Sequence, residues 1–356
     1  MIGNRLKLAR NAAGLSMAAL GNAVGISANM IKKYEHNVNM PTSSILLKLS
    51  QVLHIPIEFF FRTTPPSLGA IEYRKKANTS VKLLKQIEAD VLDQAERWAE
   101  LADLWPNFPV PKFNLQLDLP KQIQSFDEIE FVAEKLRHHW QLGLNPLPNL
   151  IDLFESKGIL VIISEVDQNA KFDGLQAHIQ NMPIIVVSAH WSGSRQRFTL
   201  AHELGHLILQ GRLSHNIDEE KACHRFASAF LLPKDSAFNE LGEKRSDISI
   251  YELKALKQEF GLSMQACLYR AKDLGIVSEY WYKQKCIQFS SLGWRKKEPY
   301  EDIVYQEQTL LFKQLVHRAL SEDIITESKA AELLKMPLTL FNAQHRGVDD
   351  NVEIFS

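Results

Sequence analysis

Two histidines and a glutamate form the stretch of this sequence best suited to chemistry. His202 and His206 stand four residues apart in the pattern H-E-x-x-H, and Glu203 follows the first of them. Residues 198–209 around them are mostly apolar, which predicts an amphipathic helix. On a helix, residues four apart share a face, so both imidazoles can bind one metal ion. The Glu203 carboxylate lies one step around the helix, where it can take a proton from water without being a ligand.

This pattern predicts a zinc hydrolase. Zinc lowers the pKa of a water molecule, and Glu203 would accept the proton that this water releases. The alternative is a helix whose two histidines are ordinary polar residues that bind no metal. The apolar neighbours favour the metal site, because buried imidazole and carboxylate groups need partners and a metal ion supplies them.

A hydrolytic zinc site needs a third protein ligand and keeps one position open. The next helix is expected to begin near Asn216 or Asp218, to run through Phe230 and to be ended by Pro233. The candidate ligands in or just before it are His215, Glu219, Glu220, Cys223 and His224. Spacing alone does not choose among them.

The elements that must position this motif are three strands and two helices. Residues 158–163 are a short buried run, residues 175–180 alternate apolar and polar side chains, and residues 183–187 are again apolar. Helices are expected at 125–140 and at 148–157, the second with its proline at the first helical position. Strands packed on a motif-bearing helix predict an α+β body, in which the alternating strand could pair with an extended peptide.

The first 63 residues predict a small basic domain of five short helices. They carry seven basic and two acidic side chains, a net charge of +5, and since the whole chain carries −1 the remainder carries −6. Two short helices around Gly25 predict a helix-turn-helix, whose second helix would enter the major groove of DNA. The polar residues on its exposed side are Ser27, Asn29, Lys32 and Lys33. The asparagine suits a base edge, and the lysines suit phosphates.

The regions on either side of the catalytic body are predicted to be a linker and a tail. Residues 63–66 form a break rich in threonine and proline. A long helix at 81–105 has a heptad-like apolar stripe, which favours packing and would also allow a dimer contact, and prolines at 106–120 then predict an extended connection. Residues 276–356 predict a helical tail. Its helix pair at 326–334 and 338–343 lacks a basic recognition face, so the tail is suited to packing or to docking a partner.

The amino-acid composition indicates where in the cell the protein is expected to work. The chain has 45% hydrophobic and 23% charged residues, which is ordinary for a soluble protein. Its apolar runs stay below the roughly 20 residues needed to span a bilayer, so no membrane partner is expected. Three cysteines, and an N-terminus without a signal-peptide pattern, favour a reducing, cytoplasmic location.

The first domain resembles the XRE family of phage-repressor-like regulators. The resemblance rests on Leu15-Ser16, Leu20-Gly21, Val24-Gly25-Ile26-Ser27, Ile31-Lys32-Lys33-Tyr34-Glu35, Pro41 and the run 46–53. It implies binding to double-stranded DNA, on which the protein would be associated with the bacterial nucleoid. Met17 stands where the family usually has a glutamine that contacts the DNA backbone. The alternative is a helical docking domain that no longer binds DNA.

Residues 197–206 and 220–233 together resemble the ImmA/IrrE family of zinc metallo-endopeptidases. In that family the second block runs approximately E-x-x-A-N-x-F-A-x-x-L-L-x-P, and its opening glutamate is the third metal ligand. The matching residue is Glu220. The resemblance therefore implies Zn²⁺ held by His202, His206 and Glu220, with Glu203 as the general base. His224 replaces the usual asparagine, and could lie behind a ligand, contact substrate or compete as a ligand.

Together these resemblances predict an α+β, mostly helical protein: a five-helix XRE-type head, a zincin-like metallopeptidase body with a small sheet packed on the H-E-x-x-H helix, and a helical C-terminal tail. The expected domains are 1–63, 64–125, 126–275 and 276–356.

The expected function is that of a DNA-associated endopeptidase and regulator. It would cleave a small helix-turn-helix repressor, or an antitoxin or toxin partner, and so derepress transcription, as in a stress response that supplies a trigger. The alternative is a non-proteolytic repressor or antitoxin that uses the zinc domain as a sensor or partner-binding module. His178 and His190 are candidates for stabilising the oxyanion, and the sequence does not choose between them.

Overall fold

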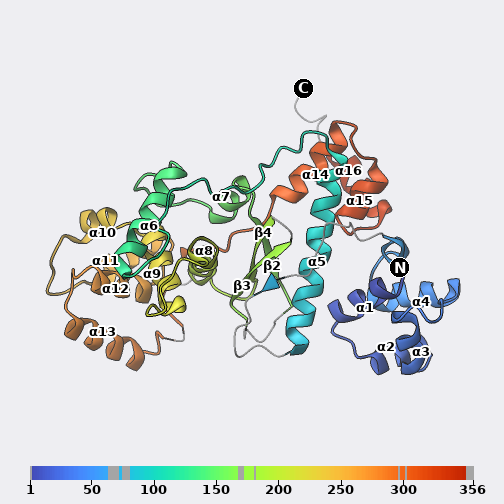
Figure 1. Cartoon of the computed structure of the whole chain (residues 1–356), viewed down its shortest axis with the longest axis horizontal. Coiled ribbons are helices and arrows are strands. Elements are labelled where there is room, and N and C mark those ends of the chain that lie inside the picture. The colour runs from blue at the N-terminus through green and yellow to red at the C-terminus, as the bar shows by residue number, and fades with distance from the viewer. Residues whose placement is uncertain are drawn as a thin grey trace. The chain divides into compact units, whose positions relative to one another are not determined.

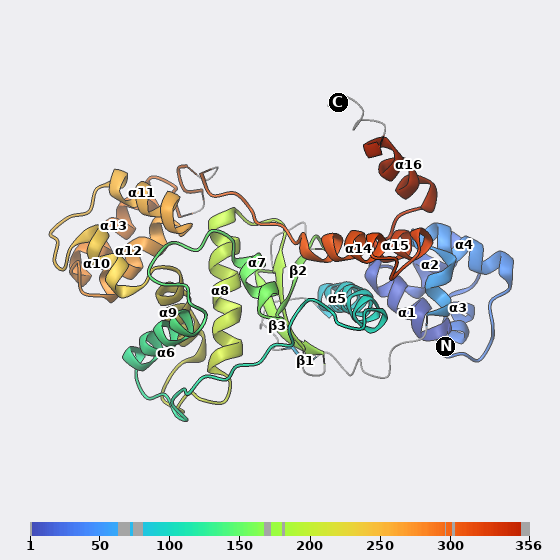
Figure 2. The same cartoon turned by 90° about the horizontal axis from the view of Figure 1, so that it is seen from above.

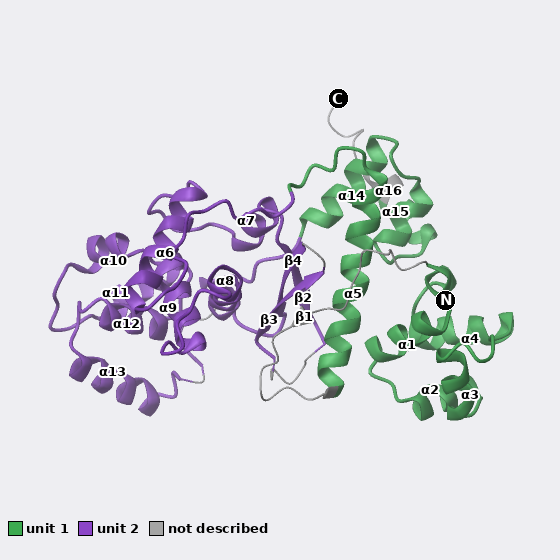
Figure 3. Ribbon diagram, in the orientation of Figure 1, with its two compact units in different colours: residues 1–72, 77–111, 310–356 green, residues 73–76, 112–309 purple. Residues whose placement is uncertain are grey.

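The computed structural model divides the chain into two compact units (Figures 1 and 3). The residues that it describes are 2–62, 72–73, 81–166, 172–179, 182–295, 297–300 and 303–349. Unit 1 comprises Met1–Glu72, Ala77–Pro111 and Leu310–Ser356, and unit 2 comprises Tyr73–Lys76 and Lys112–Thr309. The predicted break at 63–66 lies outside the described residues. The predicted fold class, α+β and mostly helical, is confirmed.

The two units divide the chain differently from the four predicted domains. The head shares unit 1 with the long helix that follows it and with the C-terminal helices, while residues 276–309, predicted as part of the tail, lie in unit 2. The two units do not show which parts of the chain fold independently. The four domains therefore remain a prediction.

The head in unit 1 consists of four α-helices and a 3₁₀ helix. These are α1 (Ile2–Ala12), α2 (Met17–Val24), α3 (Ala28–Glu35), α4 (Ser43–Leu53) and η1 (Ile57–Phe61). Ser16 and Ser27 cap α2 and α3, where their hydroxyls accept hydrogen bonds from backbone N–H groups. Gly25 ends α2 with φ at +83°, a conformation that glycine adopts at little cost. The fifth predicted helix is the 3₁₀ segment, and Pro56 is its N-cap.

The rest of unit 1 is built on α5 (Val81–Leu104). With it are α14 (Leu311–Ser321), α15 (Glu327–Leu333) and α16 (Leu338–Asp349). The predicted stripe on α5 is buried and consists of Leu84, Ile87, Val91, Ala95, Trp98 and Leu101. The helix packs against α1, and the Trp98 ring stacks on that of Phe312 with centroids 6.0 Å apart. Burial of the stripe in the single chain favours its predicted packing role.

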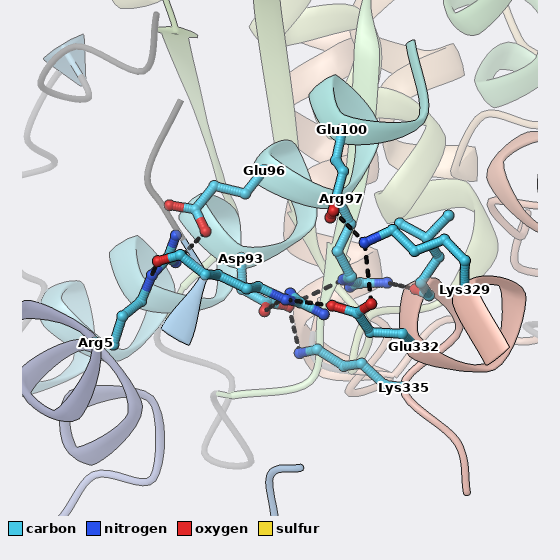
Figure 4. A network of polar contacts seen from close by, with 10 residues as sticks. Arg5, Asp93, Glu96, Arg97, Glu100, Lys329, Glu332 and Lys335 are labelled. Atoms are coloured by element: carbon cyan, nitrogen blue, oxygen red, sulfur yellow. Dashed lines mark hydrogen bonds and ion pairs between the residues drawn. The ribbon is translucent and has the colours of Figure 1, made fainter. Parts of the chain in front are cut away.

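Ion pairs join α5 to the head and to α15 (Figure 4). On α5, Glu96 pairs with Arg5 of α1, and Asp93 pairs with Arg97 and with Lys335. Arg62, at the end of the head, donates to Glu332 of α15 at 2.9 Å. The side chains of Arg5, Glu96 and Asp93 are at most 7% exposed, so these charges would be costly to leave unpaired. The pairs therefore link three parts of the sequence within unit 1.

The sheet of unit 2 has the order β1-β3-β4-β2. Its strands are β1 (Glu72–Tyr73), β2 (Leu160–Ser164), β3 (Gly174–Ile179) and β4 (Met182–Ser188). The central strand β4 pairs parallel with β2 and antiparallel with β3. The three predicted strands correspond to β2, β3 and β4, although the predicted end of β3 at Gln180 lies outside the described residues.

Unit 2 contains eight helices in the part that the structure describes. They are α6 (Phe126–His139), α7 (Leu150–Ser156), α8 (Gly193–Leu209), α9 (Glu219–Leu231), α10 (Lys234–Leu241), α11 (Ile250–Phe260), α12 (Met264–Asp273) and α13 (Glu279–Ser291). Of these, α7 and α8 pack on the sheet. The motif helix α8 has β3 and β4 on one side and α9 on the other (Figures 1 and 2). Apolar side chains from both sides meet α8 in one core.

The start of α7 differs from its prediction. Pro148 was expected at the first helical position, but the helix begins at Leu150 with Asn149 as its N-cap. The Asn149 side chain accepts a hydrogen bond from Asp152 N at 3.0 Å. Asparagine is a strong N-cap residue, and this bond sets the start of the helix two residues after the proline.

Glu155 of α7 makes the stability of unit 2 depend on pH. Its side chain is buried, and burial raises the pKa of the carboxyl from its ordinary 4.5 to about 8, with nearby Asp152 adding to the effect. Between these pH values the folded chain keeps a proton that the unfolded chain releases, so stability falls as the pH rises toward 8. Glu155→Gln should remove this decline and stabilise the protein at pH 8 by more than about 1 kcal/mol.

Thermal unfolding of the full chain at pH 5 and pH 8 measures this difference. The exposed Glu240 of α10 offers a matched control, and Glu240→Gln should leave the pH dependence of the wild-type protein intact. Parallel pH dependence in the wild-type and Glu155→Gln proteins would contradict the assignment.

Candidate metal centre and nucleic-acid interface

Helix α8 brings the three motif residues together in the interior of unit 2. His202, Glu203 and His206 are 4%, 2% and 6% exposed. The two imidazole rings lie 4.8 Å apart at an angle of 85°. This arrangement places both rings on the side of α8 that α9 approaches, so the next helix determines what completes the site.

The first turn of α9 places Glu220 against both histidines. Its carboxylate oxygens lie 3.4 Å from His202 Nε2 and 3.5 Å from His206 Nε2. In a tetrahedral shell with ligands about 2.0–2.1 Å from zinc, donor atoms are about 3.4 Å apart. Among the described residues, these three form a group whose donor atoms all lie within 4.8 Å of one another. Two imidazoles and a carboxylate at these separations fit a zinc ion.

Two further observations agree with a metal at this position. Both ring nitrogens of His202 are buried, and neither makes a hydrogen bond within the described part of the chain. Burying a polar atom without a hydrogen bond costs about 1–3 kcal/mol, and a metal on Nε2 would offset this cost at that atom. The Glu220 side chain is 56% exposed, so the group is open to solvent on one side, as a hydrolytic site requires.

Gly205 lets α9 come close enough for Glu220 to reach the histidines. A Cβ atom on Gly205 would lie 3.1 Å from Cδ1 of Phe226 and 3.3 Å from Cα of Cys223. The Asp218 side chain starts α9 by accepting a hydrogen bond from Lys221 N at 2.9 Å. Cys223, one of the candidate ligands by spacing, is buried at the contact between the two helices.

The Glu203 carboxylate, one step around α8 from His202, lies against the first residue of β3. A Cβ atom on Gly174, the first residue of β3, would lie 3.2 Å from Glu203 Oε1 and 2.9 Å from the carbonyl oxygen of Val186. The missing side chain at Gly174 therefore leaves room for this carboxylate. The candidate general base thus lies next to the strand predicted to pair with an extended peptide.

The three other histidines considered from the sequence, His224, His178 and His190, make different contacts. His224 is exposed, and its ring lies 4.7 Å from that of His202 and stacks on that of Phe198 at 5.7 Å. His178 Nδ1 lies 2.8 Å from the Gln176 amide on β3, and His190 Nε2 lies 3.2 Å from the carbonyl oxygen of Glu165. None of the three belongs to the converging group, and the oxyanion partner stays unassigned.

The carboxylate of Glu307, which was not predicted from the sequence, anchors the first turns of α8. Glu307 is buried, pairs with Arg197 of α8, and accepts hydrogen bonds from the N–H groups of Leu150 and Ile151 at the start of α7. The backbone N–H of Glu307 donates to the Gln196 side chain at 2.8 Å. More than a hundred residues separate Glu307 from Arg197, so the sequence carries no local signal of this contact.

On the head, α3 presents the polar residues predicted to contact DNA. Asn29, Lys32 and Lys33 are exposed. The Ser27 hydroxyl accepts a hydrogen bond from Met30 N at 3.2 Å, so this residue also starts the helix. Met17, which replaces the usual glutamine, is partly buried against the core of the head.

The exposed positive charge of the head comes from its lysines. The three arginines are buried or nearly so, and pair with Glu96, Glu35 and Glu332. The exposed lysines of the head are Lys7, Lys32, Lys33 and Lys48. Part of the +5 charge counted from the sequence is therefore neutralised by ion pairs inside unit 1. The charge that stays exposed includes Lys32 and Lys33 of α3.

Comparison with known protein families supports the assignments of the head and of the region that contains the metal centre. Residues 154–272 match the family model of the IrrE N-terminal-like domain, a peptidase family, and residues 6–60 match a helix-turn-helix model. The chain thus joins an XRE-type helix-turn-helix domain to an IrrE/ImmA-like domain, and the predicted resemblances are confirmed. A helix-turn-helix domain of this kind supports binding to double-stranded DNA. Within the described ranges, none of the helices combines the length and apolar character needed to span a bilayer.

The curated relatives are similar to a short part of this chain. Uncharacterised helix-turn-helix regulators of Sinorhizobium medicae (strain WSM419) and Rhizobium meliloti (strain 1021) are each 39% identical over 68 residues, which is 19% of this chain and 49% of theirs. A transcriptional regulator in the ATPase CF(0) region of Rhodospirillum rubrum is 33% identical over 60 residues, 17% of this chain and 56% of its own. The chain spans about half the length of the curated relatives it matches.

The Glu307 contact predicts a specific loss of stability. The side chains of Glu307 and Arg197 are 8% and 6% exposed, so Glu307→Gln leaves a buried guanidinium without its counter-charge. Breaking such a pair costs about 3–5 kcal/mol. For a unit of this size, the midpoint of unfolding should fall by about 2–4 °C per kcal/mol, which calorimetry of the full chain measures.

The matched control is Glu279→Gln on α13. Glu279 pairs with Lys283 at 3.5 Å, but both side chains are more than half exposed. An exposed pair contributes less than about 1 kcal/mol. Equal shifts in the two variants would show that Glu307 does not anchor α8.

Proposed function

We propose that this protein is a DNA-associated zinc metallo-endopeptidase and transcriptional regulator. The observation that carries the proposal is the convergence of His202, His206 and Glu220 beside the buried carboxylate of Glu203. The match to a peptidase family over residues 154–272 supports the same assignment.

The chemistry follows from the residues at this centre. A zinc ion held by His202, His206 and Glu220 would polarise a peptide carbonyl and lower the pKa of water. Glu203, held between α8 and the backbone of β3, accepts a proton as water attacks the carbonyl, and then gives a proton to the leaving amine. Strand β3 lies between β4 and the two-residue strand β1, so an extended substrate would pair with β3 only beyond the end of β1.

The head delivers this activity to DNA. Asn29 would contact a base edge, Lys32 and Lys33 would contact phosphates, and Ser27 would lie at the start of the recognition helix. The protein would work in the cytoplasm, on the nucleoid when bound to DNA, and could bind paired half-sites as a homodimer. Its substrate would be a small helix-turn-helix repressor, or an antitoxin or toxin partner, whose cleavage releases transcription once a trigger is present.

Substitution of the general base tests the peptidase activity. Glu203→Gln keeps the three ligands, so the protein should still bind zinc, while cleavage of the partner should fall by about 10²–10⁴-fold. A reporter for the target gene should then stay repressed after the trigger. His202→Ala removes a ligand and should lose the bound zinc, which metal analysis of the purified protein measures. Glu240→Gln serves as the unaffected control.

A second candidate function is a non-proteolytic repressor or antitoxin. The observation in its favour is that the curated relatives are named as helix-turn-helix regulators and match only 19% of this chain. Derepression that persists unchanged in the Glu203→Gln protein would favour this second function and exclude the peptidase.

The salt dependence of DNA binding tests the interface on α3. Each phosphate contact contributes about 0.9 to the slope of log affinity against log salt concentration. The double substitution Lys32→Ala, Lys33→Ala should therefore weaken binding to a duplex carrying the protein's own promoter and reduce the slope by about 2. Lys244→Ala, on an exposed residue of unit 2, is the control. A slope that does not change in the double variant would favour a protein-docking role for the head.

A further inference from the structure

Two consecutive acids on the first turn of α9 approach opposite nitrogens of one histidine. Glu219 Oε1 lies 3.1 Å from His206 Nδ1, and Glu220 Oε1 lies 3.5 Å from His206 Nε2. The two carboxylates therefore approach different nitrogens of the same imidazole ring. Only Glu220 belongs to the group that converges on the candidate metal position.

His202 is held in a different way. Its buried Nδ1 makes no hydrogen bond within the described part of the chain. Its ring instead lies between those of His206 and His224, at centroid distances of 4.8 and 4.7 Å. Packing orients His202, whereas a hydrogen bond to Glu219 is available to orient His206.

We propose that Glu219 is a positioning residue for His206 in the metal centre. When Nδ1–H donates to the Glu219 carboxylate, the lone pair of the ring is on Nε2, the nitrogen that faces Glu220 and His202. The bond also fixes the rotation of the ring, so less freedom is lost when the metal binds. This inference rests on the proposed function, because it assigns a role within the same zinc site.

A helix-end role for Glu219 makes a different prediction. Glu219 is the first residue of α9, and an acid at a helix N-terminus stabilises the helix by about 0.3–1 kcal/mol whatever else it contacts. Asp218, one residue earlier, supplies the N-cap bond to Lys221 N at 2.9 Å. Asp218 is therefore the matched control, since its loss weakens the same helix end without removing the bond to His206.

The test measures the zinc dissociation constant of the full chain by competition with a chelator. Glu219→Ala should weaken zinc binding by about 10–100-fold, the effect typical of losing a partner behind a ligand. Glu219→Gln should restore part of this loss, because the amide oxygen still accepts from Nδ1–H. Asp218→Ala should stay within about twofold of wild type, and Glu220→Ala should lose more than Glu219→Ala because a ligand is removed.

The visible absorption spectrum of the cobalt-substituted protein separates a positioning residue from a ligand. The Glu219→Ala spectrum should keep the band positions of wild type, and the Glu220→Ala spectrum should not. The inference would be overturned by unchanged zinc affinity in Glu219→Ala, by equal losses in Asp218→Ala and Glu219→Ala, or by a Glu219→Ala spectrum like that of Glu220→Ala. A wild-type protein that binds no zinc would instead overturn the proposed function itself.

Discussion

The close packing of α9 on α8 is the contact on which the candidate metal centre depends. Each histidine comes from α8, but neither can form a three-ligand group until Glu220 on the neighbouring helix reaches them. Gly205 makes this possible, because a side chain there would press on Phe226 and on the backbone of Cys223. The separations of 3.4 and 3.5 Å between the Glu220 oxygens and the two Nε2 atoms therefore depend on this packing.

Other contacts hold α8 from the remaining directions. The strands β3 and β4 cover one side, and the missing side chain of Gly174 lets the Glu203 carboxylate lie against the backbone of the sheet. At its N-terminal end, α8 is tied to Glu307 through Arg197. The motif helix is therefore fixed at its start, along its sheet side and along its contact with α9. These contacts limit the movement of His202, Glu203 and His206, which the proposed reaction needs in place.

The parts of this arrangement that follow a local rule could be predicted from the sequence. The four-residue spacing of His202 and His206 and the apolar run around them indicate a helix and a shared face. The strands were predicted by their apolar or alternating residues, and α2 and α3 by the Gly25 turn between them. Pro148 was wrongly placed because Asn149 is the stronger capping residue.

The parts that depend on tertiary contacts could not be predicted in this way. Spacing left five candidates for the third ligand, and resemblance rather than geometry chose Glu220. The bond from His206 to Glu219 depends on the crossing of two helices, and Glu307 approaches from a distant part of the chain. The pairing of the arginines of the head, which lowers its exposed charge, depends in the same way on α5 and α15.

X-ray absorption spectroscopy at the zinc edge of the purified protein tests whether His202, His206 and Glu220 hold zinc, because it reports the ligand atoms without requiring a known substrate. We expect one zinc ion with only nitrogen and oxygen neighbours at about 2.0–2.2 Å and with the scattering pattern of two imidazoles. A sulfur neighbour at about 2.3 Å, which would indicate Cys223 or another cysteine, would contradict it. So would a single imidazole, or a protein that holds no zinc.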